Sequence, residues 1–334
     1  MHPAGYGAAM ATGRGRVGRA LGLAALAALV AAGCSSGHGK SAPTSLPAGV
    51  GPGGATRLAV GRRLVTFVDR SRPTPAVNGH ARLPARAMPT LVLYPAVAPG
   101  GSKGVHVVDG AAPRAGRSPL VVFLPGIGST GADYQSHLVS WAAAGYVVAS
   151  PTLPVANGRG GSGVDYRNDT EDLGFVISSM LGASDPVRAH VDPGAVAVAG
   201  HSIGAQTVLG HVYNSCCGDP RVGAAVAISG SELPYGGDWS APPTTPLLLV
   251  HGQDDHVVGF ASSQHVFDTF PGPRAFLVYP GATHASQFQG RPGVLLDATV
   301  VAFLDRWLRH DPAPWQALPA KVGASGVATL ATRG

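Results

Sequence analysis

The sequence predicts an α/β fold with one mostly parallel sheet of about eight strands and helices on both faces. From about Thr56 onward, short apolar runs alternate with longer segments of helical spacing. The later runs are apolar throughout, as expected of strands that are buried on both faces. No linker-like segment interrupts residues 56–310, so we expect a single domain without a large inserted cap.

Each expected element follows from this alternation. The expected strands cover residues 64–68, 90–94, 120–124, 147–150, 195–199, 224–228, 247–250 and 275–278. The expected helices cover residues 133–144, 167–181, 203–214, 262–269 and 294–308. After His310 the chain becomes rich in Pro and Ala, so we expect residues 311–334 to form a low-complexity tail that frays.

Composition and charge exclude some functions. Charged residues make up 13% of the 334 residues, and the formal net charge is +6. Arg14, Arg16 and Arg19 are the only charged residues of the first 33, so three of the six charges lie there. No run of Lys and Arg remains in the rest of the chain. Nucleic acid is therefore not an expected partner.

The N-terminus has the pattern of a secretory signal. Three arginines precede the apolar stretch 20–32, whose helix of about 20 Å is too short for a bilayer core of roughly 30 Å. The segment 31–34, Ala-Ala-Gly-Cys, resembles a bacterial lipobox. We therefore expect residues 1–33 to be a lipoprotein signal peptide, Cys34 to carry the lipid and residues 34–55 to form a flexible linker. The protein would then be anchored outside the cytoplasm; the alternative is an ordinary secreted protein.

Cysteine usage predicts neither a disulfide framework nor a metal site. The chain has three cysteines, and Cys216 and Cys217 are adjacent. Their spacing is not that of a zinc site, so a pair of buried thiols or a local bridge between neighbours is expected. No metal or cofactor is expected.

The sequence Gly200-His201-Ser202-Ile203-Gly204 carries the main functional signal. Gly-x-Ser-x-Gly alone occurs by chance, but here it joins an expected strand to an expected helix. In that setting the serine lies in a tight turn, where Gly200 and Gly204 avoid clashes with the neighbouring strand and helix. The motif predicts Ser202 as a nucleophile.

Acyl transfer also requires donors for an oxyanion. One is expected to be the backbone N–H of Ile203, directly after the nucleophile. The other is expected from the Gly-rich segment 125–128 after the third strand, with the N–H of Ile127 as the candidate. The alternative for this segment is a simple turn between a strand and a helix.

The acid and the base are expected to follow the serine in that order. Asp254 and Asp255 come after the strand 247–250, and either could orient a histidine. His284 lies in the loop after the eighth strand, and the other histidines of the chain lie outside this loop. We predict His284 as the general base.

Residues 61–74, 86–96 and 119–154, together with the elbow around Ser202, resemble a broad group of bacterial α/β-hydrolases. That group contains dienelactone-hydrolase-like, chlorophyllase-like, platelet-activating-factor-acetylhydrolase-like and cutinase or polyester-hydrolase enzymes. The resemblance covers roughly residues 56–310 and implies the α/β-hydrolase fold. The usual Gly-x-x-Asp register of the group selects Asp255 rather than Asp254.

The resemblance is less specific for the substrate. Ile127 and His201 replace aromatic residues of the polyester hydrolases, and this departure argues against polyester cleavage. Tyr235 lies where those enzymes have an aromatic substrate contact, so it is either a substrate contact or an ordinary loop tyrosine.

Together these residues predict a serine hydrolase that cleaves a small-molecule or lipid-like carboxylic ester through an acyl-enzyme. The alternatives with the same triad are a lipase, polyester hydrolase, thioesterase or peptidase, which a substrate panel would separate. A further alternative is a non-catalytic binding lipoprotein, whose expected sign would be a missing triad residue.

Overall fold

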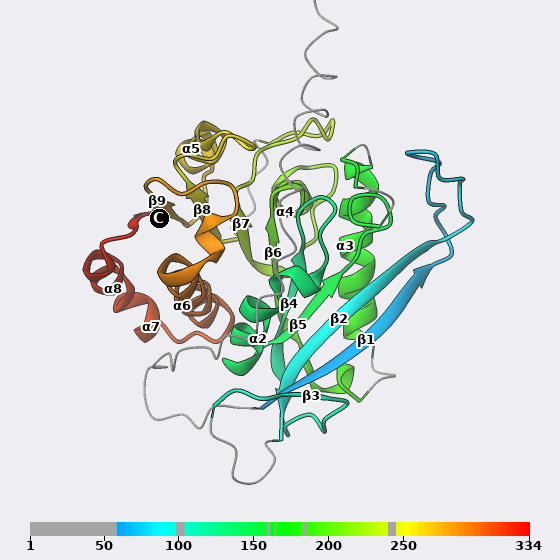
Figure 1. Ribbon diagram of the computed structural model, residues 1–334, viewed down its shortest axis with the longest axis horizontal. Coiled ribbons are helices and arrows are strands. Elements are labelled where there is room, and N and C mark those ends of the chain that lie inside the picture. Colours follow the sequence, from blue (N-terminus) through cyan, green and yellow to red (C-terminus); the bar gives the residue numbers. More distant parts are fainter. Residues whose placement is uncertain (1–58, 98–103, 159–160, 164, 183–185, 240–244) are drawn as a thin grey trace, which may run out of the picture. The chain divides into compact units, whose positions relative to one another are not determined.

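The computed structural model describes residues 59–97, 104–158, 161–163, 165–182, 186–239 and 245–334 (Figure 1). In these ranges ten strands form one sheet in the order β10-β9-β8-β7-β6-β4-β5-β2-β1-β3. The strands are β1 (Ala59–Asp69), β2 (Arg86–Ala96), β3 (Val107–Asp109), β4 (Ser118–Leu124), β5 (Val147–Pro151), β6 (Val191–His201), β7 (Val222–Ile228), β8 (Leu247–Gly252), β9 (Arg274–Tyr279) and β10 (Thr329–Arg333). All neighbours from β5 through β4 to β9 pair in parallel, whereas β2 pairs antiparallel with β1 and β5.

The expected mostly parallel sheet with helices on both faces is confirmed. Each of the eight expected strands lies within an observed strand, and each of the five expected helices matches an observed one. The helices are α2 (Gln135–Ala143), α3 (Tyr166–Leu181), α4 (Ile203–Tyr213), α5 (Phe260–Thr269), α6 (Gly290–Leu308), α7 (Ala313–Gln316) and α8 (Leu318–Ser325). No helix in the described ranges is both long and apolar enough to span a bilayer. The predicted signal peptide, Cys34 and the linker lie outside these ranges.

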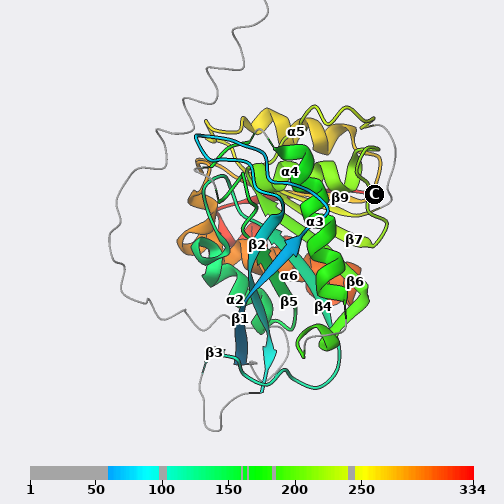
Figure 2. The same ribbon diagram turned by 90° about the vertical axis from the view of Figure 1, so that its right-hand side faces the viewer.

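The sheet separates two apolar cores because side chains alternate along each strand. In β4, Val122 and Leu124 pack on one face with residues of α3, α4 and α5. Val121 and Phe123 pack on the other face with residues of α2, α6, α7 and α8. Figures 1 and 2 show α3 and α6 on opposite sides of the sheet. Burial on both faces explains why β4 is apolar throughout.

The expectation of a fraying C-terminal tail is wrong. Residues 313–325 form α7 and α8, and β10 pairs antiparallel with β9 at the edge of the sheet. Three apolar side chains, Trp315, Leu318 and Val322, follow one another at helical spacing and are buried in the core beside α6. Alanine favours helices, and a few buried anchors are enough to hold such a segment.

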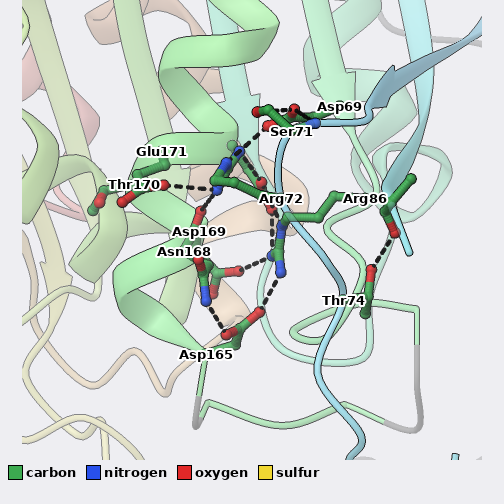
Figure 3. A network of polar contacts seen from close by, with 12 residues as sticks. Asp69, Ser71, Arg72, Thr74, Arg86, Asp165, Asn168, Asp169, Thr170 and Glu171 are labelled. Atoms are coloured by element: carbon green, nitrogen blue, oxygen red, sulfur yellow. Dashed lines mark hydrogen bonds and ion pairs between the residues drawn. The ribbon is translucent and has the colours of Figure 1, made fainter. Parts of the chain in front are cut away.

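A buried ionic network joins β2 to α3 (Figure 3). Arg86 is fully buried and donates two hydrogen bonds to Asp172, at 2.7 and 2.6 Å, and one to Asp165 at 2.8 Å. Arg72 also reaches Asp172 at 2.7 Å. Asp169 is buried in the same network, but its carboxyl oxygens have no hydrogen-bond partner among the described residues. The network fixes the start of α3, because Asp165 directly precedes this helix.

Candidate active site

Ser202 occupies a strained turn between β6 and α4. Its backbone has φ 56° and ψ −123°, a conformation that residues other than glycine rarely adopt. The N–H of Ser202 donates to the carbonyl of Ile228 in the neighbouring strand β7, at 2.9 Å. The side chain therefore lies at the carboxyl end of the parallel strands and at the N-terminus of α4, where partial positive charge favours an anion.

Glycine is required at both ends of this turn. A Cβ at Gly200 would clash with the backbone of Gly204, and a Cβ at Gly204 would clash with the carbonyl of Leu124 in β4. Neither neighbour is a flexible side chain that could move aside. Helix α4 can therefore start this close to the sheet only without side chains at these two positions.

Asp255 and His284 come together in the structure. His284 Nδ1 lies 2.7 Å from Asp255 Oδ2, although the residues are 29 positions apart. Asp255 follows β8 and is buried, whereas Asp254 is exposed. The structure thus brings His284 together with Asp255, the aspartate that the resemblance selected.

The carboxylate of Asp255 has further partners. Its Oδ1 accepts the N–H groups of Val257 and Val258, both at 2.9 Å, and His251 Nε2 lies 3.1 Å from its Oδ2. Burial acts to raise the pKa of Asp255, but the hydrogen bonds from His251, His284 and Val258 outweigh burial and hold the pKa well below its usual value. Asp255 is therefore an anion at neutral pH, able to orient His284.

His201 links the elbow to the loop of His284. Its Nε2 lies 2.9 Å from the carbonyl oxygen of His284, and its Nδ1 lies 2.8 Å from the hydroxyl of Tyr134. A carbonyl only accepts, so Nε2 carries the proton and Nδ1 accepts from Tyr134 in the neutral ring. Burial, with the nearby His284, lowers the pKa of His201 to about 3. His201 is therefore a neutral, fixed connection.

Neither N–H of the two expected oxyanion donors has a backbone hydrogen-bond partner in the described ranges. The N–H of Ile127 has no hydrogen-bond partner in the described part of the chain. Ile203 is the first residue of α4, so its N–H has no partner within the helix. The turn that carries Ile127 packs on the elbow, because a Cβ at Gly126 would lie 3.4 Å from Ser202 Cβ and 3.1 Å from His201 Nδ1.

Tyr235 is not brought together with these residues. Its side chain is 1% exposed, packs against Gly210 of α4 and donates its hydroxyl to the carbonyl of Gln206 at 3.1 Å. It forms one wall of a cavity of about 370 Å³ between α3 and the loop after α4. None of the three predicted triad residues lines this cavity. The substrate contact of Tyr235 stays a prediction.

Cys216 and Cys217, which also line this cavity, form a disulfide. The local bridge was one of the two expected arrangements. Cys216 is exposed and Cys217 half-buried, so the alternative of two buried thiols does not describe them. Across the described ranges, no group of three or more His, Cys, Asp or Glu side chains is placed to hold a metal ion.

Sequence reasoning missed the supporting roles of His201, His251 and Tyr134. His201 lies within the motif, so its position was visible, but its partners are 67 and 83 residues away. His251 lies four positions before Asp255. Residues four apart are neighbours in a helix, but this segment was expected to be a strand end and a loop, so no contact was predicted. Nothing in the local pattern indicates Tyr134.

Comparison with known proteins supports the fold. Neither the family models nor the curated protein sequences contain a match to this chain. Among solved structures, a ferulic acid esterase from Streptomyces cinnamoneus is similar, with a TM-score of 0.63 and 22% sequence identity. The match covers 85% of this chain and 98% of the esterase. The chain has the α/β-hydrolase fold. As many as 1053 chains of solved structures match, so the likeness does not specify a substrate.

Proposed function

We propose that this protein is a serine hydrolase that cleaves carboxylic esters. One observation carries the proposal: His284, whose Nδ1 lies 2.7 Å from Asp255, is also bonded through its carbonyl to His201, the neighbour of Ser202 in the strained turn at φ 56°. The contact of His201 with the carbonyl of His284, at 2.9 Å, supports a position of the proposed base close to the proposed nucleophile. The similarity in fold to a ferulic acid esterase is consistent with this activity.

The chemistry follows from the roles of these groups. Ser202 Oγ attacks the ester carbonyl carbon while His284 takes the hydroxyl proton. The N–H groups of Ile127 and Ile203 donate to the oxyanion of the tetrahedral intermediate. His284 then gives the proton to the leaving alcohol, and an acyl-Ser202 ester remains. Water attacks this ester with His284 as base, and the carboxylic acid leaves as Ser202 regains its proton. Asp255 stabilises the imidazolium that forms in both steps.

The test is hydrolysis of p-nitrophenyl esters of increasing acyl length by the full-length protein. We expect turnover that falls at least about 1000-fold in Ser202→Ala, since loss of one triad member removes most of the rate. Asp255→Asn should fall comparably, whereas the matched change of its exposed neighbour, Asp254→Asn, should retain the wild-type rate. Thioesters, peptides, a polyester film and methyl ferulate complete the panel. Folded wild-type protein that cleaves no ester would refute the proposal.

We further propose that the enzyme acts outside the cytoplasm, anchored to the membrane through a lipid on Cys34. The arginines and apolar stretch before this residue support the proposal. In a bacterial host, radiolabelled palmitate should label the wild type but not Cys34→Ser. Equal labelling of both would contradict the anchor.

A further inference from the structure

The turn that carries Ile127 is held at several points. The carbonyl of Gly126 accepts the N–H of Ser129 at 3.0 Å, which closes the turn, and Gly128 has φ 69°. The N–H of Gly126 donates to the hydroxyl of Tyr134 at 3.2 Å. The N–H of Gly128 donates to the carbonyl of Ala156 at 2.8 Å. Ala156 belongs to the segment 152–158, which therefore lies against the turn.

Asn157 makes the second contact between the segment and the turn. Its side-chain Nδ2 donates to the carbonyl of Gly126 at 2.8 Å, and its Oδ1 accepts the N–H of Leu153 at 2.9 Å. The carbonyl can only accept and the N–H can only donate, so the two partners define the orientation of the amide. The residue is 9% exposed, and its own N–H donates to the carbonyl of Leu153 at 3.1 Å. Asn157 is thus a fixed donor.

This contact determines where the N–H of Ile127 points. The Gly126 carbonyl and the Ile127 N–H belong to one trans peptide plane and point in opposite directions. A hydrogen bond that holds the carbonyl on Asn157 therefore directs the N–H away from Asn157. Gly126 has no Cβ, which lowers the steric barrier to rotation of this peptide. In a rotated peptide the carbonyl oxygen would replace the donor and repel an oxyanion.

We propose that Asn157 is a positioning residue that holds the Ile127 N–H in place as an oxyanion donor. The inference rests on the proposed function of the site. The turn bond from Ser129 remains when Asn157 is removed, so we expect a smaller loss than for complete removal of a donor. The expected fall in kcat is about 10- to 100-fold, against 100- to 1000-fold for a lost oxyanion donor.

Two variants test the contact. Asn157→Ala removes both side-chain bonds, whereas Asn157→Asp retains the acceptor for Leu153 and replaces the donor to Gly126 with a carboxylate oxygen, which only accepts. The matched control is Asn214→Ala, at the far end of α4. Asn214 is 1% exposed and also accepts a backbone N–H, from Cys216 at 3.0 Å. Thermal melts establish that each variant is folded at the assay temperature.

The readouts are kcat and KM for an ester and the inhibition constant of a trifluoromethyl ketone, which forms an oxyanion on the nucleophile. Both Asn157 variants should lose kcat with little change in KM, and should bind the ketone more weakly by a similar factor. Asn214→Ala should match the wild type in both. If Asn157→Ala does not fold, the kcat and the ketone affinity of Asn157→Asp test the proposal.

Unchanged kcat and ketone affinity in folded Asn157 variants would overturn the inference. So would a loss of kcat with unchanged ketone affinity, since that would indicate disorder of the segment rather than loss of the donor. Wild-type protein that neither cleaves esters nor binds the ketone would refute the proposed function itself. The two failures are therefore distinguishable.

Discussion

The neutral state of His201 predicts how the stability of this protein depends on pH. The pKa of His201 is about 3 in the folded protein, mainly because of burial, against an ordinary value of 6.5. Between these values the unfolded chain binds a proton that the folded chain does not, so stability falls as the pH falls. The slope is about 1.4 kcal/mol per pH unit. From pH 7.5 to pH 5 the loss from this one group is about 2 kcal/mol.

His201→Gln removes the titrating ring but retains a donor and an acceptor. The free energy of unfolding is measured in urea by tryptophan fluorescence at pH 7.5, 6.0 and 5.0. We expect the stability of the wild type relative to His201→Gln to fall by about 2 kcal/mol over this range. Asp255 does not contribute here, because its pKa is lowered and its effect begins only near or below 3.8.

Tyr134→Phe is the control for this measurement, because it removes the hydroxyl bonded to His201 but keeps the ring. It should lower stability by about 1 kcal/mol at every pH while preserving most of the acid loss. If the difference in free energy of unfolding between the wild type and His201→Gln is the same at pH 7.5 and pH 5, His201 is not the source of the acid sensitivity.

Two further predictions concern glycine packing and the buried network. Gly204→Ala should lower the melting temperature strongly and abolish activity, since its methyl meets the Leu124 carbonyl. The control Gly323→Ala, where a Cβ meets nothing within 4 Å in α8, should stabilise by up to about 1 kcal/mol. Burial, then the nearby Asp172 and Asp165, raise the pKa of Asp169, so its contribution to stability is lost as the pH rises above 3.8. Asp169→Asn should therefore be more stable than wild type in urea at pH 8; lower stability would show that the carboxylate is stabilised by its neighbours.

The parts of the fold that could be predicted are those with local signals. Each apolar run of the central sheet is buried on both faces, so it stands out in the sequence. The elbow around Ser202 was predictable because five consecutive residues and their flanking elements define it. The edge strand β10 was not, because its residues are mostly exposed and have no apolar pattern. Its place depends on pairing with β9, more than 50 residues earlier in the chain, which composition does not encode.

Polar contacts between segments that are distant in the sequence could not be predicted either. Arg86 and Asp172 are 86 residues apart, and each alone resembles an ordinary surface residue. Asn157 lies outside the helices and strands, and its contact with Gly126 spans 31 residues. Such bonds depend on how closely two segments that are distant in the sequence approach each other. A single sequence gives the residue types but not this approach.

The supporting contacts explain why a neutral histidine suits position 201. The rings of His201 and His284 have centroids 4.6 Å apart, and His284 becomes an imidazolium in the proposed reaction. A second cation at this distance would destabilise that state, whereas a neutral ring with its proton on Nε2 donates to the His284 carbonyl without adding charge. Because its pKa is low, His201 can hold the base loop without adding a charge. Asp255 alone then stabilises the positive charge on His284. The acid sensitivity predicted above has the same origin.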